Sequence, residues 1–149
     1  MKRLLIAACV WAMAGTAWGQ VDVTSAWARA TVPGQMGTGA FMTIVSKEGG
    51  RLIGAASPVA GVVELHEMSM ENNVMKMRPI TGLDLPAGRE IQLKPGGHHV
   101  MLLDLKRPLK AGDKVKIELR LETRDGKRVT QPVEVEVRQG APAHEAHKQ

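Results

Sequence analysis

The sequence predicts an all-β protein, a Greek-key β-sandwich or barrel of about eight or nine short strands. From residue 21 onward, apolar and polar residues alternate with period two in short runs, which Gly, Pro, Asn and Asp separate. Successive side chains of a strand point to opposite faces, so this alternation is typical of strands with one buried face. No later stretch has the length and period of a helix. Short strands joined by such turns favour an antiparallel sandwich or barrel.

The expected strands follow one another closely along the chain. They lie around Trp27, ending near Pro33, and at residues 39–46, 51–56, 61–68, 74–80, 90–94, 98–105, 114–121 and 133–137. The alternation is clearest at residues 114–121, where apolar side chains occupy every second position between polar and charged ones. Asn72-Asn73 and Asp125-Gly126 are typical of tight hairpin turns, because these residue types tolerate positive φ angles.

The N-terminal segment, residues 1–19, is typical of a secretory signal peptide. Lys2 and Arg3 precede an apolar run at residues 4–14, and Ala17-Trp18-Gly19 is a small-x-small cleavage sequence. The apolar run is shorter than the roughly 20 residues that a membrane-spanning helix needs. We therefore expect cleavage after Gly19, export from the cytoplasm and no membrane span.

A lipoprotein signal competes with this interpretation. Ile6-Ala7-Ala8-Cys9 resembles a lipobox, but only five residues separate Arg3 from Cys9, which is too short for an apolar h-region. Cys9 is the only cysteine and is expected to leave with the signal. The mature chain would then contain neither a disulfide nor a thiol, so any metal site in it must use other ligands.

The rest of the chain is expected to form one domain, residues 20–138, followed by a disordered tail, residues 139–149, that is small, polar and proline-containing. Removal of the signal lowers the formal net charge from +5 to +3, because 18 of the 20 basic residues remain beside 15 acidic ones. These charges are scattered along the strands and aromatic residues are few. The pattern does not indicate a nucleic-acid-binding surface.

Histidine and methionine are concentrated in two segments, which hold three of the five histidines and five of the nine methionines. The segments are His66-Glu67-Met68-Ser69-Met70 with Met75-Lys76-Met77, and His98-His99-Val100-Met101 after Pro95-Gly96-Gly97. Residues two apart in a strand share a face, so His99 projects with Met101, and His98 to the opposite side. Imidazole and thioether suit a soft monovalent cation, so the pattern points to a Cu(I) site.

The same residues have ordinary interpretations. A methionine in a strand is usually core packing, and a histidine near a strand end is usually solvated or hydrogen-bonded. The joint occurrence of both residue types in both segments favours a metal site, but spacing alone leaves the two interpretations open. No nucleophile triad, carboxylate pair or phosphate loop is recognisable, so we expect a binding protein and not an enzyme.

The positions of His66, Met77, His99 and Met101 resemble the motif of periplasmic copper chaperones of the PCuAC type. That motif is His, ten residues, Met, twenty-one residues, His, one residue, Met, and this chain matches it in full. The resemblance covers roughly residues 21–137. The similar surroundings are Ala26-Trp27-Ala28-Arg29, Glu64-Leu65-His66-Glu67, Met75-Lys76-Met77-Arg78-Pro79, Pro95-Gly96-Gly97 and Met101-Leu102-Leu103-Asp104-Leu105.

The resemblance implies a cupredoxin-like Greek-key β-sandwich that binds one Cu(I) per chain through His66, Met77, His99 and Met101. It also implies a metallochaperone whose copper goes to an oxidase CuA subunit or to a thioredoxin-like assembly factor. We expect a monomer with no nucleic-acid partner. Two alternatives stay open: a protein that sequesters copper, and a structural sandwich that uses no metal.

Some histidines and methionines lie outside the four-point motif. Met68, Met70 and Met75 could guide the ion in or out, or could simply be packing. Some relatives carry His- and Met-rich tails that help to bind Cu(II). For His144 and His147 in the tail two interpretations stay open, a weak Cu(II) site or solvated side chains.

Overall fold

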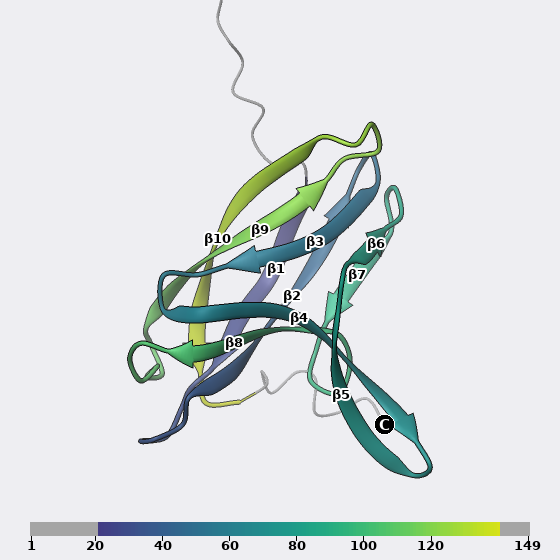
Figure 1. The fold of residues 1–149 in the computed structure, drawn as a ribbon. Coiled ribbons are helices and arrows are strands. Elements are labelled where there is room, and N and C mark those ends of the chain that lie inside the picture. The colour runs from purple at the N-terminus through teal and green to yellow at the C-terminus, as the bar shows by residue number, and fades with distance from the viewer. Residues whose placement is uncertain (1–20, 141–149) are drawn as a thin grey trace, which may run out of the picture.

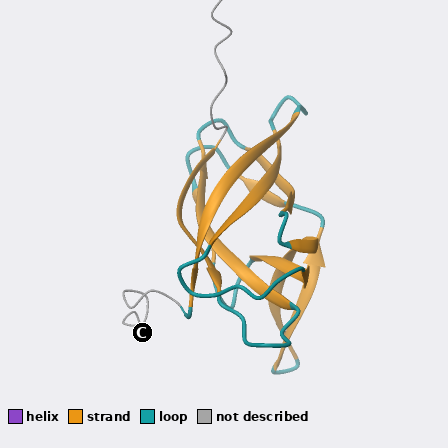
Figure 2. Ribbon diagram, turned by 90° about the vertical axis from the view of Figure 1, so that its left-hand side faces the viewer, coloured by secondary structure: helices purple, strands orange, loops and turns teal. Residues whose placement is uncertain are grey.

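The computed structural model describes residues 21–140, which form ten β-strands (Figure 1). The strands are β1 Val21–Arg29, β2 Gly37–Ser46, β3 Gly50–Ala56, β4 Ala60–Glu71, β5 Val74–Ile80, β6 Leu83–Leu85, β7 Glu90–Leu93, β8 His99–Leu105, β9 Lys114–Glu122 and β10 Arg128–Arg138. Figure 2 shows strands and loops throughout this part of the chain and no helix, so none there could cross a membrane. The predicted signal peptide and the predicted tail beyond residue 140 lie outside the described residues.

The structure differs from the predicted strand pattern at β6 and at β10. β6 has three residues, which is too few for an alternation to be recognised. β10 begins at Arg128 instead of Val133, because its antiparallel register with β9 starts at the pair Arg128↔Glu122. Pro132 is tolerated inside β10 because β10 pairs with β1 only from Glu136 onward, which leaves one edge unpaired at the proline.

The ten strands belong to one sheet, which folds over on itself into two layers (Figures 1 and 2). The strand order is β5-β4-β8-β2-β1-β10-β9-β3-β6, and β7 pairs with β2 as well. β1 and β10 are parallel neighbours, and the other pairs are antiparallel. The pairs β2–β8, β4–β8 and β3–β9 join segments far apart in the sequence, as Greek-key connections do. The predicted all-β Greek-key sandwich is confirmed.

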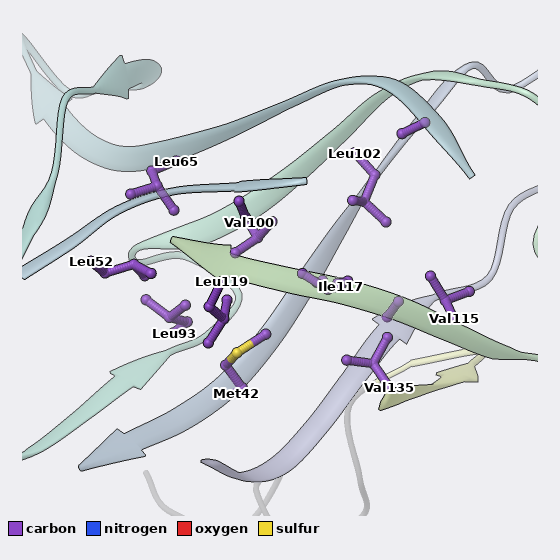
Figure 3. Close-up of a cluster of buried hydrophobic side chains, with 14 of the residues drawn as sticks. Met42, Leu52, Leu65, Leu93, Val100, Leu102, Val115, Ile117, Leu119 and Val135 are labelled. Carbon is purple, nitrogen blue, oxygen red and sulfur yellow. The ribbon is translucent and has the colours of Figure 1, made fainter. Parts of the chain in front are cut away.

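One hydrophobic cluster fills the space between the two layers. In Figure 3, side chains from distant strands meet in it, among them Val100 and Leu102 of β8 and Ile117 and Leu119 of β9. These four side chains are fully buried. Complete burial of such a side chain contributes about 1.5–3 kcal/mol. The cluster therefore stabilises the fold through apolar packing, as expected of a domain without disulfides.

The β4–β5 hairpin extends beyond the body of the sandwich (Figure 1). Its two-residue turn, Asn72-Asn73, has φ angles of 50° and 63°. Two positive φ angles are what a type I′ turn requires, and asparagine adopts them more readily than most residues. β4 pairs with β8 up to His66 and with β5 from Leu65 to Glu71. His66 therefore lies where three strands meet.

Candidate metal centre

The pairing of β4 with β8 places His66 and His99 directly opposite each other. Their ring centroids are 5.8 Å apart, and both residues are buried. Cross-strand partners in an antiparallel sheet project from the same face. Two histidines from distant parts of the sequence are thus brought into one site by the strand register.

Met77 reaches the same site from β5. Its cross-strand partner is Met68, which lies two residues beyond His66 on β4 and on the same face. The Met77 Sδ atom lies 3.1 Å from Nε2 of His99. Met77 is 48% exposed, so its sulfur lies at the rim of the site, between the buried imidazole and solvent.

Met101 approaches from β8, two residues after His99. It pairs with Gly39 of β2 on one side and with Glu64 of β4 on the other. A Cβ atom at Gly37 would lie 3.7 Å from Met101 Cε and 3.2 Å from a methyl of Leu103. Gly37 of β2 therefore lies beside the Met101 methyl group.

An open pocket of about 270 Å³ lies between β5, β8 and β2. It is lined by Arg29, Gln35, Gly37, Thr38, Gly39, Phe41, Met68, Met77, Pro95, Gly96, His99 and Met101. Three of the four residues expected from the sequence, Met77, His99 and Met101, are in this lining. His66 is not, and it lies buried beside the His99 ring.

A hydrogen bond to the main chain determines which nitrogen of His99 carries the proton. Nδ1 lies 3.0 Å from the carbonyl oxygen of Gly97, which can only accept, so Nδ1 donates. Gly96, with a φ angle of 81°, forms part of the turn that brings this carbonyl under the ring. Nε2 then carries no proton and faces the Met77 sulfur, which has no proton either. The lone pairs of the nitrogen and the sulfur therefore face each other with no hydrogen bond between them.

Glu64 likewise determines which nitrogen of His66 carries the proton. Its Oε2 atom lies 2.7 Å from His66 Nε2, so Nε2 carries a proton and donates a hydrogen bond to the carboxylate. His66 Nδ1 is buried and has no hydrogen-bond partner among the described residues. A proton there would be a buried donor without an acceptor, which is costly. Nδ1 therefore presents a free lone pair.

The pKa of His99 lies below its ordinary value of 6.5. Burial is the largest cause, and repulsion from the nearby Arg29 acts in the same direction. The hydrogen bond to Gly97 opposes the shift but does not cancel it. His99 is therefore neutral at neutral pH, with its lone pair available to a cation.

An aromatic layer supports His99 from β1 and β2. The Phe41 ring centroid lies 6.2 Å from that of His99 and 4.7 Å from that of Trp27. The Arg29 guanidinium carbon lies 5.7 Å above the Phe41 ring. Trp27 and Phe41 are both buried, yet neither belongs to the main core cluster. They form a second packing layer on the site's side of the sheet.

Reasoning from the sequence assigned no role in the site to Glu64, Phe41 or Arg29. The alternation along β2 places Phe41 and Met42 on opposite faces of that strand. Nothing in the local sequence shows that β8 lies next to β2. His98 lies where the alternation predicts, on the other face, with its Nε2 3.7 Å from a Glu67 oxygen.

The donor set fits a soft monovalent cation. The hydrogen bonds to Gly97 and Glu64 leave one nitrogen without a proton on each of His99 and His66, and the thioethers of Met77 and Met101 line the same pocket as His99. Neither sulfur needs to lose a proton in order to bind. Thioether and imidazole together favour Cu(I) over harder divalent cations, which prefer oxygen, nitrogen or thiolate.

Comparison with known proteins gives a consistent result. The family described as "Putative lipoprotein LpqE-like" matches residues 21–136. The chain is 37% identical over 131 residues to "Putative lipoprotein Lxx21020" of Leifsonia xyli subsp. xyli, a match that covers 86% of this chain and 75% of that protein.

Solved structures show the same fold. The solution structure of apo-DR1885 from Deinococcus radiodurans is 31% identical and has a TM-score of 0.60, covering 94% of this chain and 93% of that one. The CuI-DR1885 structure is 32% identical with a TM-score of 0.53, covering 85% and 84%. The apo PCuAC domain from PmoF1, 21% identical with a TM-score of 0.64, covers 83% and 97% and shows similarity of fold. The chain belongs to the LpqE-like family, and its fold is the cupredoxin-like sandwich of PCuAC domains.

Proposed function

We propose that this protein is a copper carrier that binds one Cu(I) per chain through His66, Met77, His99 and Met101. The observation that carries the proposal is the 3.1 Å contact between His99 Nε2 and Met77 Sδ, two atoms that both lack a proton to share. A cation bound by both atoms would turn this unfavourable contact into a favourable one. The lone pair on the buried His66 Nδ1 is a third donor without a partner.

The donor set also supports a carrier in preference to a permanent metal site. Thiolates would bind copper more tightly and would be oxidised outside the cytoplasm, whereas thioethers stay neutral and form no disulfide. Met77 is half exposed, so one sulfur ligand lies within reach of a partner's ligands. Release can then proceed by stepwise ligand exchange, without opening the core.

The relatives support copper as the cargo. DR1885, whose Cu(I) form has been solved, is more than 30% identical to this chain over most of its length. The copper-bound PCuAC domain from PmoF2 shares the fold at 24% identity. Four soft ligands around one ion leave no open position for a substrate, so we propose a binding role and no catalysis.

We propose further that the carrier works in the periplasm, as a monomer. The signal-like sequence at residues 1–19 and the description of its relatives as lipoproteins both support export. The acceptor that best fits the cargo is an oxidase CuA subunit, or a thioredoxin-like factor that assembles it. Sequestration of copper for protection is the second candidate, since the same site would serve it.

X-ray absorption of the anaerobic Cu(I)-loaded protein tests the site directly, because it counts the sulfur and nitrogen neighbours of the ion. We expect two of each and one copper per chain. A copper ion without sulfur neighbours, or zinc binding at this site as tight as Cu(I) binding, contradicts the proposal. Deletion of the gene separates the two roles: lower oxidase activity in copper-poor medium supports delivery, and copper sensitivity with normal oxidase supports sequestration.

A further inference from the structure

Four methionines line one face of the β4–β5 hairpin. Met68 pairs with Met77, and Met70 pairs with Met75, in a register that continues without a bulge to the turn. Because directly opposite residues share a face, all four side chains lie on the face that also carries His66. We call these four residues the methionine ladder, with an inner rung of Met68 and Met77 and an outer rung of Met70 and Met75.

The opposite face of the hairpin is charged and held by ion pairs. Arg78 Nε lies 2.7 Å from a Glu67 oxygen, and Lys76 Nζ lies 3.1 Å from a Glu71 oxygen. Such exposed pairs contribute little stability individually, but here they connect the two strands along the length of the hairpin. The two strands are thus linked on the charged face, and the thioethers on the other face are not needed to join them.

The outer rung is exposed in a way that packing does not explain. Met70 is 63% exposed and Met75 is 46% exposed, whereas the core methionine Met42 is 1% exposed. Two large apolar side chains facing each other in solvent contribute little to the hydrophobic core. Their shared property is the thioether, which is the donor type that the pocket also uses.

We propose that Met70 and Met75 form a second, weaker site for Cu(I), from which the ion passes along the methionine ladder to the pocket. The inference rests on the proposed function and extends it by naming the entry and exit route. Adjacent rungs are about 6.8 Å apart along the strands, close enough for flexible thioethers of both rungs to bind one ion during transfer.

The direction of transfer follows from the donors. The outer rung offers two neutral sulfurs, while the inner rung includes Met77, whose sulfur already contacts His99. Adding imidazole donors strengthens binding, so the ion moves inward when the pocket is empty. The outer rung is then free to receive a second ion, or to present the first to an acceptor.

The test is an anaerobic Cu(I) titration followed by NMR of methionine methyl groups. We expect the Met77 and Met101 methyls to shift during the first equivalent and the Met70 and Met75 methyls during the second. In the double variant Met70→Leu/Met75→Leu, we expect that the second equivalent of Cu(I) no longer binds. Transfer of Cu(I) from the pocket to a chelator should also be slower than in the wild type. Leucine keeps the apolar surface, so these losses would not come from a lost protein-docking face.

Met36→Leu is the matched control, because Met36 is an exposed methionine on a different segment, at 57%. It should retain both equivalents and the wild-type transfer rate. The inference is overturned if the Met70 and Met75 methyls never shift, if they shift no more than that of Met36, or if the double variant behaves as the wild type. Absence of the first shifts, at Met77 and Met101, would instead contradict the proposed function.

Discussion

His99 Nε2 and Met77 Sδ lie 3.1 Å apart, although the two residues are 22 positions apart in the sequence and belong to strands that do not pair. β4 lies between β5 and β8 and brings them together, because it pairs with both around His66. The site therefore depends on three strands in register and not on a single local motif.

We predict that Met77→Leu weakens Cu(I) binding by about tenfold or more, a loss of at least about 1.4 kcal/mol. Leucine has a similar volume, and the half-exposed position makes its cost to folding small, below about 1.5 kcal/mol. Competition with a Cu(I) chelator measures the affinity, and urea unfolding measures the stability. A large loss of stability with unchanged affinity would mean that Met77 is a packing residue.

Glu64→Gln should lower Cu(I) affinity through His66, without removing a ligand. The carboxylate accepts a hydrogen bond from His66 Nε2–H and so keeps Nδ1 without a proton. Loss of such an outer partner typically lowers metal affinity by about 10–100-fold. Glu67→Gln is the control, because Glu67 lies on the charged face of the same strand and pairs with Arg78. Equal affinities in the two variants would argue against an orienting role for Glu64.

Gly39→Ala should displace the Phe41 ring and disturb His99. A Cβ atom at Gly39 would lie 2.9 Å from Phe41 Cζ, closer than such contacts allow. We expect a destabilisation of about 1–3 kcal/mol and altered NMR shifts of the His99 ring. Gly54→Ala provides the comparison, because there the added atom meets only an Arg120 side chain at 3.8 Å. Wild-type His99 shifts in Gly39→Ala would show that the aromatic layer does not position the imidazole.

The stability of the metal-free protein should fall as the pH is lowered from about 7 toward 5. The pKa of His99 in the folded state is below its ordinary value of 6.5, because burial disfavours the charged ring. Between the two pKa values the unfolded chain binds more protons than the folded one, so stability rises with pH in that window. Urea unfolding at several pH values measures the slope. In His99→Gln the slope should be smaller, and an unchanged slope would assign it to other groups.

Mass spectrometry of the exported protein should find an N-terminus at Gln20. The signal-like segment contains a small-x-small sequence ending at Gly19, while its lipobox-like sequence lies too close to Arg3. Cys9→Ser should leave processing unchanged. Retention of Cys9 with a lipid attached would show instead that this chain is anchored, in keeping with the lipoprotein descriptions of its relatives.

Much of the fold could be predicted because it follows from local alternation. The strand at Val74–Ile80 and the turn at Asn72-Asn73 lie where their residues predict them. Residues two apart share a face in any strand, so the common direction of His99 and Met101 needed no knowledge of the fold. β6 was missed because three residues contain too little pattern to recognise.

The sequence by itself determined the strands, the faces on which histidines and methionines lie and, through the family resemblance, the four residues proposed as ligands. Only the tertiary structure decided that β4 lies between β5 and β8, that Glu64 and Gly97 leave one nitrogen free on each histidine, and that Phe41 supports His99. The physical reason is that alternation specifies which way a side chain points, whereas strand order and register depend on how the whole core packs.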